Sequence, residues 1–307
     1  MASRAGRTSA KKRRLSAPKP VARGARRSAA PKFWPNGARL AISISLMVES
    51  PAEPPQMFLA PDGKRYPDLP AETGIQYGYR EGIPRLLDLF DRVKIKCSSF
   101  ISGNCVDLIP EIGVEIARRG HECAAHGKMH DWQMQMSRQE EHAFIKEGVD
   151  SVTRVTGQIP LGYNCKALRR SPNTLSILQE LGFLYHIDDV SRDEPFIIPV
   201  NDKPFVVVPY TRHLNDFEHF VLTQQDGIAY ERALYDEFEA LYEEAEHKRR
   251  MMVISWHDRV ARPARVRVLK RFIEHAQKRS GVWFARKDDI AKWALESDLT
   301  IRESEAV

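Results

Sequence analysis

Short apolar runs alternate with amphipathic segments along most of the chain. The first run, RLAISISLMV at residues 39–48, has no charge after Arg39 and is rich in Ile, which is typical of a strand buried on both faces. Similar runs predict strands at about residues 95–101, 121–125, 159–165, 183–187, 205–208, 251–256 and 282–284. Residues 77–84 lead into a predicted helix whose apolar face carries Leu86, Leu87, Leu89 and Phe90. Apolar residues at helical spacing predict further helices at about residues 105–119, 137–156, 171–182, 230–249, 263–278 and 287–294.

This alternation predicts the fold class. Six or more strand-then-helix units with short links predict a parallel α/β sheet, wrapped as a barrel or partial barrel. Ser137-Arg138-Gln139-Glu140 has the spacing of a capping box that opens a helix, and Ser171-Pro172 is typical of another helix start. Residues 51–76 are rich in Pro and Gly and have no clear period, so we expect a long loop there, over the ends of the strands.

Composition narrows the class of protein. The 307 residues are 42% hydrophobic and 29% charged, as in an ordinary globular protein. No apolar run approaches the roughly 18 residues that span a bilayer, and no apolar segment of a signal peptide follows the basic N-terminus, so we expect a soluble, cytoplasmic protein with no membrane span. The four cysteines form no CxxC pair, which fits reduced thiols. The sequence contains no GxGxxG, GxxxxGK[ST] or GxSxG motif, so nucleotide binding and serine-hydrolase chemistry are not supported.

The net charge of +6 is unevenly distributed. Residues 1–39 hold twelve Lys or Arg and no acid, so residues 40–307 carry a net charge of −6. Residues 1–32 are also rich in Ala, Ser, Pro and Gly, and we expect them to form a disordered basic tail. Such a tail could make a weak contact with a polyanion, serve as a transit peptide, or act as a solubilising or subunit-packing arm, and we favour the last reading.

Candidate chemistry lies at the ends of the predicted strands. His126 and His130 are four residues apart beyond the apolar run at 121–125, and Glu49 directly follows the first strand. Imidazole and carboxylate groups are common ligands of zinc, and catalytic zinc sites use three protein ligands. A histidine pair alone is more often two unrelated histidines. His257-Asp258 and Asp188-Asp189 follow two other predicted strands, at the edge where α/β barrels place their active sites.

Taken together, these segments resemble the polysaccharide deacetylase (NodB-homology) family, nearest its allantoinase and cyclic-imide hydrolase-like branch. The resemblance rests on YGYREGIPRLLDLFDR at 77–92, RRGHECAAHGKMH at 118–130 and RRSPNTLSILQELGFLY at 169–185, with RDEPF at 192–196 and GVWFARKDDIAKWA at 281–294. It implies a deformed (β/α) barrel catalytic domain over residues 33–298, with a C-terminal tail at 299–307.

The resemblance also implies residue roles. Glu49, His126 and His130 match the family's metal ligands, so a divalent metal, zinc above all, is the expected cofactor. His257 resembles the family's general acid, and Arg80 matches an arginine that would contact the substrate. Asp189 or Asp193 would orient a ligand histidine or the attacking water.

Two departures from the family pattern change the expected site. The first-strand motif normally carries two acids, whereas here Met47-Val48-Glu49-Ser50 carries one, so Glu49 serves as ligand or as base. The segment GYNCKALRRSPNT replaces the arginine-containing loop of carbohydrate deacetylases. It offers four candidate substrate-binding residues: Tyr163, Asn164, Lys166 and Arg169.

We therefore expect a metal-dependent hydrolase that cleaves a non-peptide C–N bond, in an amide, cyclic amide or imide of a small molecule. The first alternative is a polysaccharide or peptidoglycan N-deacetylase. The second is a catalytically impaired member that acts as a binding protein through its basic tail. The resemblance also implies a homodimer or homotetramer.

Overall fold

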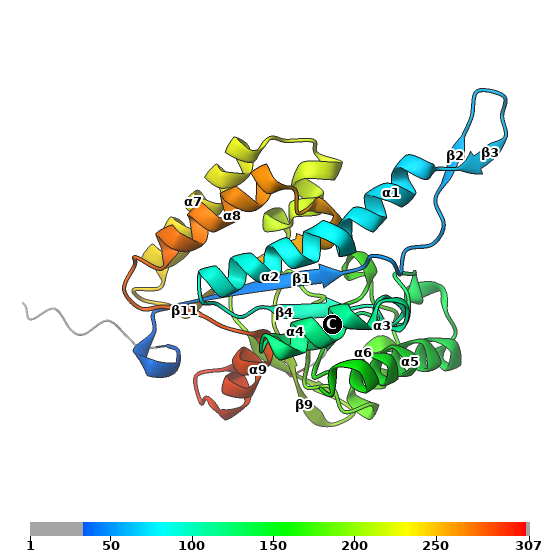
Figure 1. Cartoon of the computed structure of the whole chain (residues 1–307). Coiled ribbons are helices and arrows are strands. Elements are labelled where there is room, and N and C mark those ends of the chain that lie inside the picture. Colours follow the sequence, from blue (N-terminus) through cyan, green and yellow to red (C-terminus); the bar gives the residue numbers. More distant parts are fainter. Residues whose placement is uncertain (1–32, 305–307) are drawn as a thin grey trace, which may run out of the picture. The chain divides into compact units, whose positions relative to one another are not determined.

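The computed structural model describes residues 33–304 (Figure 1). The tail predicted at residues 1–32 lies outside the described residues. The core of the fold is a curled, mostly parallel sheet in the order β10-β1-β4-β5-β6-β7-β9-β8-β12, with β11 paired to β1. The main-sheet strands run over Leu40–Val48 (β1), Ser98–Ile101 (β4), Glu122–Ala125 (β5), Gly162–Tyr163 (β6), Tyr185–His186 (β7), Phe196–Val200 (β8), Lys203–Val207 (β9), Arg250–His257 (β10), Val282–Phe284 (β11) and Ile301–Arg302 (β12). This arrangement confirms the predicted deformed (β/α) barrel.

The first apolar run forms the centre of the sheet. All nine residues of β1 are buried, and β1 pairs in parallel with β10, β4 and β11. Its alternate side chains pack on two sides: Leu40 and Ile42 belong to the large cluster under the helices, whereas Ala41 and Met47 belong to the cluster inside the barrel. A strand covered on both faces accounts for the continuous apolar run.

Helices cover the outer face of the sheet. They run over Leu69–Tyr77 (α1), Ile83–Arg92 (α2), Gly103–Leu108 (α3), Pro110–Arg118 (α4), Arg138–Thr156 (α5), Thr174–Glu180 (α6), Gly227–Glu244 (α7), Pro263–Ala276 (α8) and Lys287–Glu296 (α9). Figure 1 shows α7 and α8 side by side. It also shows that α1 and α2 form one continuous helical segment, joined by a π-helical turn at Gly78–Gly82. No helix among residues 33–304 is long and apolar enough to cross a membrane.

Helix boundaries follow local sequence signals in part. The capping box at the start of α5 is confirmed: the Ser137 hydroxyl accepts a hydrogen bond from the Glu140 amide, and the Glu140 carboxylate accepts one from the Ser137 amide. The helix predicted at 105–119 is two helices, because Pro110 lacks an amide hydrogen and begins α4. The predicted cap at Ser171 is also displaced, since α6 begins only at Thr174.

Three segments differ from the sequence-based prediction. Residues 51–76 are not a plain loop, because Met57–Leu59 (β2) and Arg65–Pro67 (β3) form a hairpin that leads into α1. The strand predicted at 159–165 is only two residues long. The predicted C-terminal tail at 299–307 contributes β12, which pairs in parallel with β8. The strands of the exposed hairpin and β12 form only by pairing with another segment, and the local periodicity of a sequence does not reveal such a partner.

Candidate metal centre and active site

The ends of four parallel strands bring the candidate residues together. Glu49 follows β1, His126 follows β5, Asn164 follows β6, and His257 is the last residue of β10. The sheet pairing extends past the strand ends, because the His126 amide donates to Ile101 and the Asn164 amide donates to Ala125. The amides of Glu49 and Ser50 both donate to the buried Asp258 carboxylate, which fixes the turn after β1.

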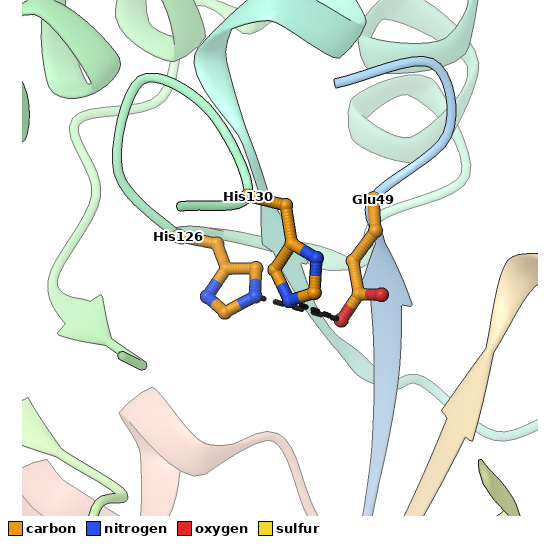
Figure 2. A group of neighbouring side chains, drawn as sticks. All are labelled: Glu49, His126 and His130. Carbon is orange, nitrogen blue, oxygen red and sulfur yellow. Dashed lines mark ion pairs between the residues drawn. The ribbon is translucent and has the colours of Figure 1, made fainter. Parts of the chain in front are cut away.

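Three histidines surround one oxygen of Glu49. Glu49 Oε1 lies 3.6 Å from His126 Nε2, 3.4 Å from His130 Nε2 and 3.4 Å from His257 Nε2. Figure 2 shows the two imidazoles of His126 and His130 turned toward this carboxylate. All four side chains are nearly buried, with side-chain exposures of 2–10%. The four side chains therefore meet at the carboxyl ends of the strands, inside the barrel opening.

The far nitrogen of each imidazole is held by an acceptor. His126 Nδ1 lies 2.6 Å from the Asn164 carbonyl oxygen, which can only accept, so Nδ1 is the donor and Nε2 is the nitrogen that carries the lone pair in the neutral ring. His130 Nδ1 lies 2.8 Å from Glu53 Oε1, and His257 Nδ1 lies 2.6 Å from Asp216 Oδ1. Outer acceptors of this kind orient metal-binding histidines in other proteins.

The ligand set fits a divalent ion. Glu49, His126 and His130 each offer one ligand atom, and these atoms lie within 4.8 Å of one another. Bond lengths of about 2.0–2.1 Å in a tetrahedral site require ligand atoms about 3.3 Å apart, close to the spacing around Glu49 Oε1. These separations are too long for N–H···O hydrogen bonds. His126 Nε2 is buried without any hydrogen-bond partner, and such an orphaned lone pair is what a metal ion satisfies.

The second carboxylate oxygen of Glu49 forms an ion pair with an arginine. Arg259 Nη1 lies 2.6 Å from Glu49 Oε2, and its Nη2 lies 3.0 Å from Glu53 Oε1. The guanidinium also lies 4.9 Å from the centre of the Phe217 ring. Arg259 thus cross-links the end of β1 to the end of β10 and directs Glu49 Oε1 toward the histidines.

The charges of this cluster shift its acid–base equilibria. Burial disfavours the charged form of Glu49, but the charges of His130, His257 and Arg259 outweigh burial and hold its pKa well below the usual range. Burial also disfavours protonated His257, yet Glu49 and Asp216 outweigh it and raise the His257 pKa. Glu49 is therefore an anion at neutral pH, and His257 retains a proton to higher pH than a free imidazole.

A cavity of about 980 Å³ opens above the cluster. Glu49, His126, His130 and His257 line its floor, and Ala71, Gly74 and Ile75 of α1 form part of one wall. Asn164, Lys166 and Arg169, which the sequence offers as candidate substrate-side residues, also line the cavity. Lys166 donates to the His130 carbonyl and lies 5.0 Å from the Trp132 ring.

The structure does not bring Arg80 to the cavity. Arg80 is exposed, and its guanidinium lies 5.7 Å from the Tyr79 ring. The neighbouring glycines explain its direction: a Cβ at Gly78 would lie 2.6 Å from Ser50 Oγ, and one at Gly82 would lie 1.9 Å from the Asp258 carbonyl oxygen. Because Gly78 and Gly82 both face the barrel, Arg80 between them faces away from it. The YGYREG motif therefore serves close packing against the site, a correction to the expected substrate contact.

Tyr163 and Asp189 also lie elsewhere. Tyr163 is fully buried in an outer cluster and donates to Gln133, because successive side chains of a strand point to opposite faces and Asn164 takes the inner one. The Asp189 carboxylate accepts from the Ser191 amide and hydroxyl in a turn. The supporting acid on this strand end is Asp188, which accepts from the Asn164 side chain and the Cys165 amide. Asp193 was the alternative to Asp189 for orienting a histidine or water. Its carbonyl oxygen accepts a hydrogen bond from the Met251 amide.

Sequence reasoning missed Asp216, Glu53 and Arg259. Arg259 directly follows His257-Asp258, and its position beside the strand-end motif was a usable signal. Asp216 lies 41 residues before its partner His257, and Glu53 lies 77 residues before His130. Nothing in the local pattern distinguishes these two from ordinary loop acids.

Comparison with known proteins agrees with this architecture. A sequence model of the family described as polysaccharide deacetylase matches residues 74–186. A solved structure of a probable polysaccharide deacetylase from Pseudomonas aeruginosa PAO1 is 31% identical, covers 89% of this chain and 96% of its own, and superposes with a TM-score of 0.79. A solved PuuE allantoinase is 30% identical, with 89% and 95% coverage and a TM-score of 0.79. The peptidoglycan deacetylase of Helicobacter pylori is 25% identical over 68% of this chain and 82% of its own length.

Proposed function

The chain belongs to the polysaccharide deacetylase family, a family of C–N hydrolases, and we propose that it hydrolyses an amide, cyclic amide or imide bond of a small molecule with the help of a divalent metal. The single observation that carries the proposal is the convergence of the lone pairs of His126 and His130 with Glu49 Oε1. Zinc is the ion we propose, because two imidazoles and one carboxylate oxygen are a common catalytic zinc set. When bound, such an ion polarises the scissile carbonyl and makes water more acidic.

The protein's own groups supply the proton transfer. His257 Nε2 faces the cavity at the catalytic cluster, and its raised pKa keeps a proton available for the leaving nitrogen near neutral pH. Asp216 accepts from His257 Nδ1 and so orients the ring and stabilises its protonated form. Met47 lines the cavity where a second acid would stand and cannot accept a proton, so Glu49 acts as the ligand in this proposal.

A small substrate suits the cavity. Its volume of about 980 Å³ is at the upper end of the range for small-molecule sites. The PuuE allantoinase, whose name states a small-molecule substrate, is as similar in structure as the relative named a polysaccharide deacetylase. The peptidoglycan deacetylase relative keeps polymer deacetylation as the alternative.

Assembly and location are further parts of the proposal. The β2–β3 hairpin projects from the barrel, and it exposes 48% of Met57, 53% of Phe58 and 63% of Leu59 (Figure 1). Such an apolar hairpin supports a homodimer or homotetramer. All four cysteines are free and buried, which is compatible with a reducing compartment such as the cytoplasm.

The test is a substrate screen with and without added zinc. We expect hydrolysis of at least one cyclic amide, imide or ureide, and a gain in rate on adding the ion. Acetate release from chitooligosaccharide or peptidoglycan would instead support the polymer deacetylase. Absence of hydrolysis in every class, together with tight polyanion binding that needs residues 1–32, would support the catalytically impaired binding protein.

A further inference from the structure

Two arginines at the mouth of the cavity lack a carboxylate partner. Arg262 immediately precedes α8 and Arg265 lies in its first turn, and both line the cavity above the catalytic cluster. Among residues 33–304, no carboxylate oxygen lies within 4.0 Å of a guanidinium nitrogen of Arg262 or Arg265. The other mouth arginine near them, Arg212, is paired with Glu218 at 2.6 Å.

The acids of the cavity lining are already occupied. Glu49 and Glu53 both contact Arg259, and Glu218 contacts Arg212. The lining thus has no free carboxylate to neutralise Arg262 and Arg265, and Lys166 and Arg169 add further positive charge. The residues that line the cavity therefore include more cations than acids, and an anionic ligand would balance this excess.

Each of the two guanidinium groups lies over an aromatic ring. The Arg262 guanidinium carbon lies 3.5 Å from the centre of the Tyr77 ring, and that of Arg265 lies 4.5 Å from the centre of the Phe220 ring. A stacked guanidinium uses its face and leaves the N–H donors along its edge free. Those donors form the fork that binds a carboxylate through two parallel hydrogen bonds.

Keeping two such cations together has an energetic cost. They are three residues apart at one helix start, and Arg265 is only partly exposed. Burial lowers the pKa of Arg265, and the charge of Arg262 lowers it further, while the negative charge of the buried Asp216 opposes both effects. An anion bound by both guanidinium groups would reduce this repulsion.

From this geometry we infer that Arg262 and Arg265 bind a carboxylate group of the substrate. This inference rests on the proposed function and narrows it: the substrate is a small amide, cyclic amide or ureide that carries a carboxylate away from its scissile C–N bond. The carboxylate anchors at the cavity mouth, while the bond to be cleaved reaches the floor at His126, His130 and His257.

The test compares two probes that differ only in charge, hydantoin-5-acetate and hydantoin-5-acetamide. Their binding is measured by calorimetry on the full chain with a His257→Ala substitution, so that neither is consumed. We expect the carboxylate to bind about 10- to 100-fold more tightly than the amide, with the difference shrinking as salt is raised. Inorganic phosphate serves as a competitor and should displace the carboxylate only weakly.

A matched pair of variants locates the site. Combined Arg262→Gln and Arg265→Gln should abolish the preference for the carboxylate while leaving the weak affinity for the amide and the melting temperature unchanged. Arg267→Gln, an exposed residue on the same helix that does not line the cavity, should leave the preference intact.

Three results would overturn the inference: no saturable binding of the carboxylate at millimolar concentration, a preference that survives the double substitution, or phosphate binding tighter than carboxylate. The inference and the proposed function fail separately. A carboxylate preference without hydrolysis of any cyclic amide by the unsubstituted chain would contradict only the function, and hydrolysis without a preference would contradict only the inference.

Discussion

Arg259 and Glu49 form an ion pair between the ends of two neighbouring strands, with Nη1 2.6 Å from Oε2. The contact joins the residue after β1 to a residue two positions past the end of β10. Because the guanidinium takes Oε2, only Oε1 is left facing the three histidines. The ion pair therefore selects which oxygen of Glu49 is offered to a metal ion, and it also places a positive charge near that ion.

Replacing Arg259 by Gln tests both effects. Glu49 and Glu53 would lose their cationic partner, and removing one side of a largely buried ion pair costs about 3–5 kcal/mol. We expect a lower melting temperature and, at the same time, tighter zinc binding, because a competing positive charge is gone. Calorimetric zinc titration and denaturant unfolding give the two readouts. Weaker zinc binding in this variant would show that Arg259 supports the site only by positioning Glu49.

Asp216→Asn tests the role of His257 as an acid. The amide can still accept from the His257 backbone but no longer supplies the negative charge that raises the His257 pKa. Since the protonated imidazole is the active form, the fall in kcat/KM with rising pH should move to lower pH. We expect kcat to drop about 10²-fold. A pH–rate profile unchanged from that of the original chain would remove His257 from this role.

Gly82→Ala tests the packing role of the YGYREG motif. A Cβ there would lie 1.9 Å from the Asp258 carbonyl oxygen, which is backbone and cannot swing away. Overpacking of this kind costs about 1–3 kcal/mol, so the free energy of unfolding should fall by at least that amount. Gly74→Ala in α1 is the matched control, because a Cβ there meets nothing within 4 Å. Equal stability of the two variants would contradict the close contact.

Glu122, which lies outside the candidate site, should make the stability of the fold depend on pH. Burial, followed by the charge of Asp288, raises the pKa of Glu122 to about 7, against 4.5 for an ordinary glutamate carboxyl group. The folded chain therefore binds more protons than the unfolded chain between these values. The contribution is fully present below pH 4.5 and is lost as the pH rises to about 7, on the order of 3 kcal/mol.

Glu122→Gln should flatten this slope, although it also weakens the contacts with Ser98, Tyr185 and the Asp288 amide. Denaturant unfolding across pH 4–8 measures the difference between the two chains. If both chains kept the same slope, Glu122 would be ionised in the folded state throughout.

The local sequence pattern was enough to predict which residues lie at the ends of the strands. Glu49, His126 and His257 each follow a continuous apolar run, and parallel strands bring their carboxyl ends to one edge, so their meeting could be expected. Reasoning from the segment GYNCKALRRSPNT, which departs from the family pattern, selected Asn164 and Arg169, and both line the cavity. It failed for Tyr163 because a single residue of register on a strand decides which face a side chain takes.

The supporting residues could not be predicted in the same way. Asp216 and Glu53 reach their histidines from loops, and loop direction depends on contacts between distant segments. Arg80 shows the opposite error: a motif that resembles the family's pattern was read as a substrate contact, whereas Gly78 and Gly82 require that segment to pack against Ser50 and Asp258.

The proposed hydrolysis needs a divalent ion held by Glu49, His126 and His130. The most direct measurement is zinc titration of the chelator-treated chain, with activity followed in parallel on a substrate identified by the screen, before and after His126→Ala. We expect the original chain to bind one equivalent of zinc and to recover activity with it, and the His126→Ala chain, folded at the same temperature, to do neither. Equal activity of the two chains after chelation would contradict this expectation.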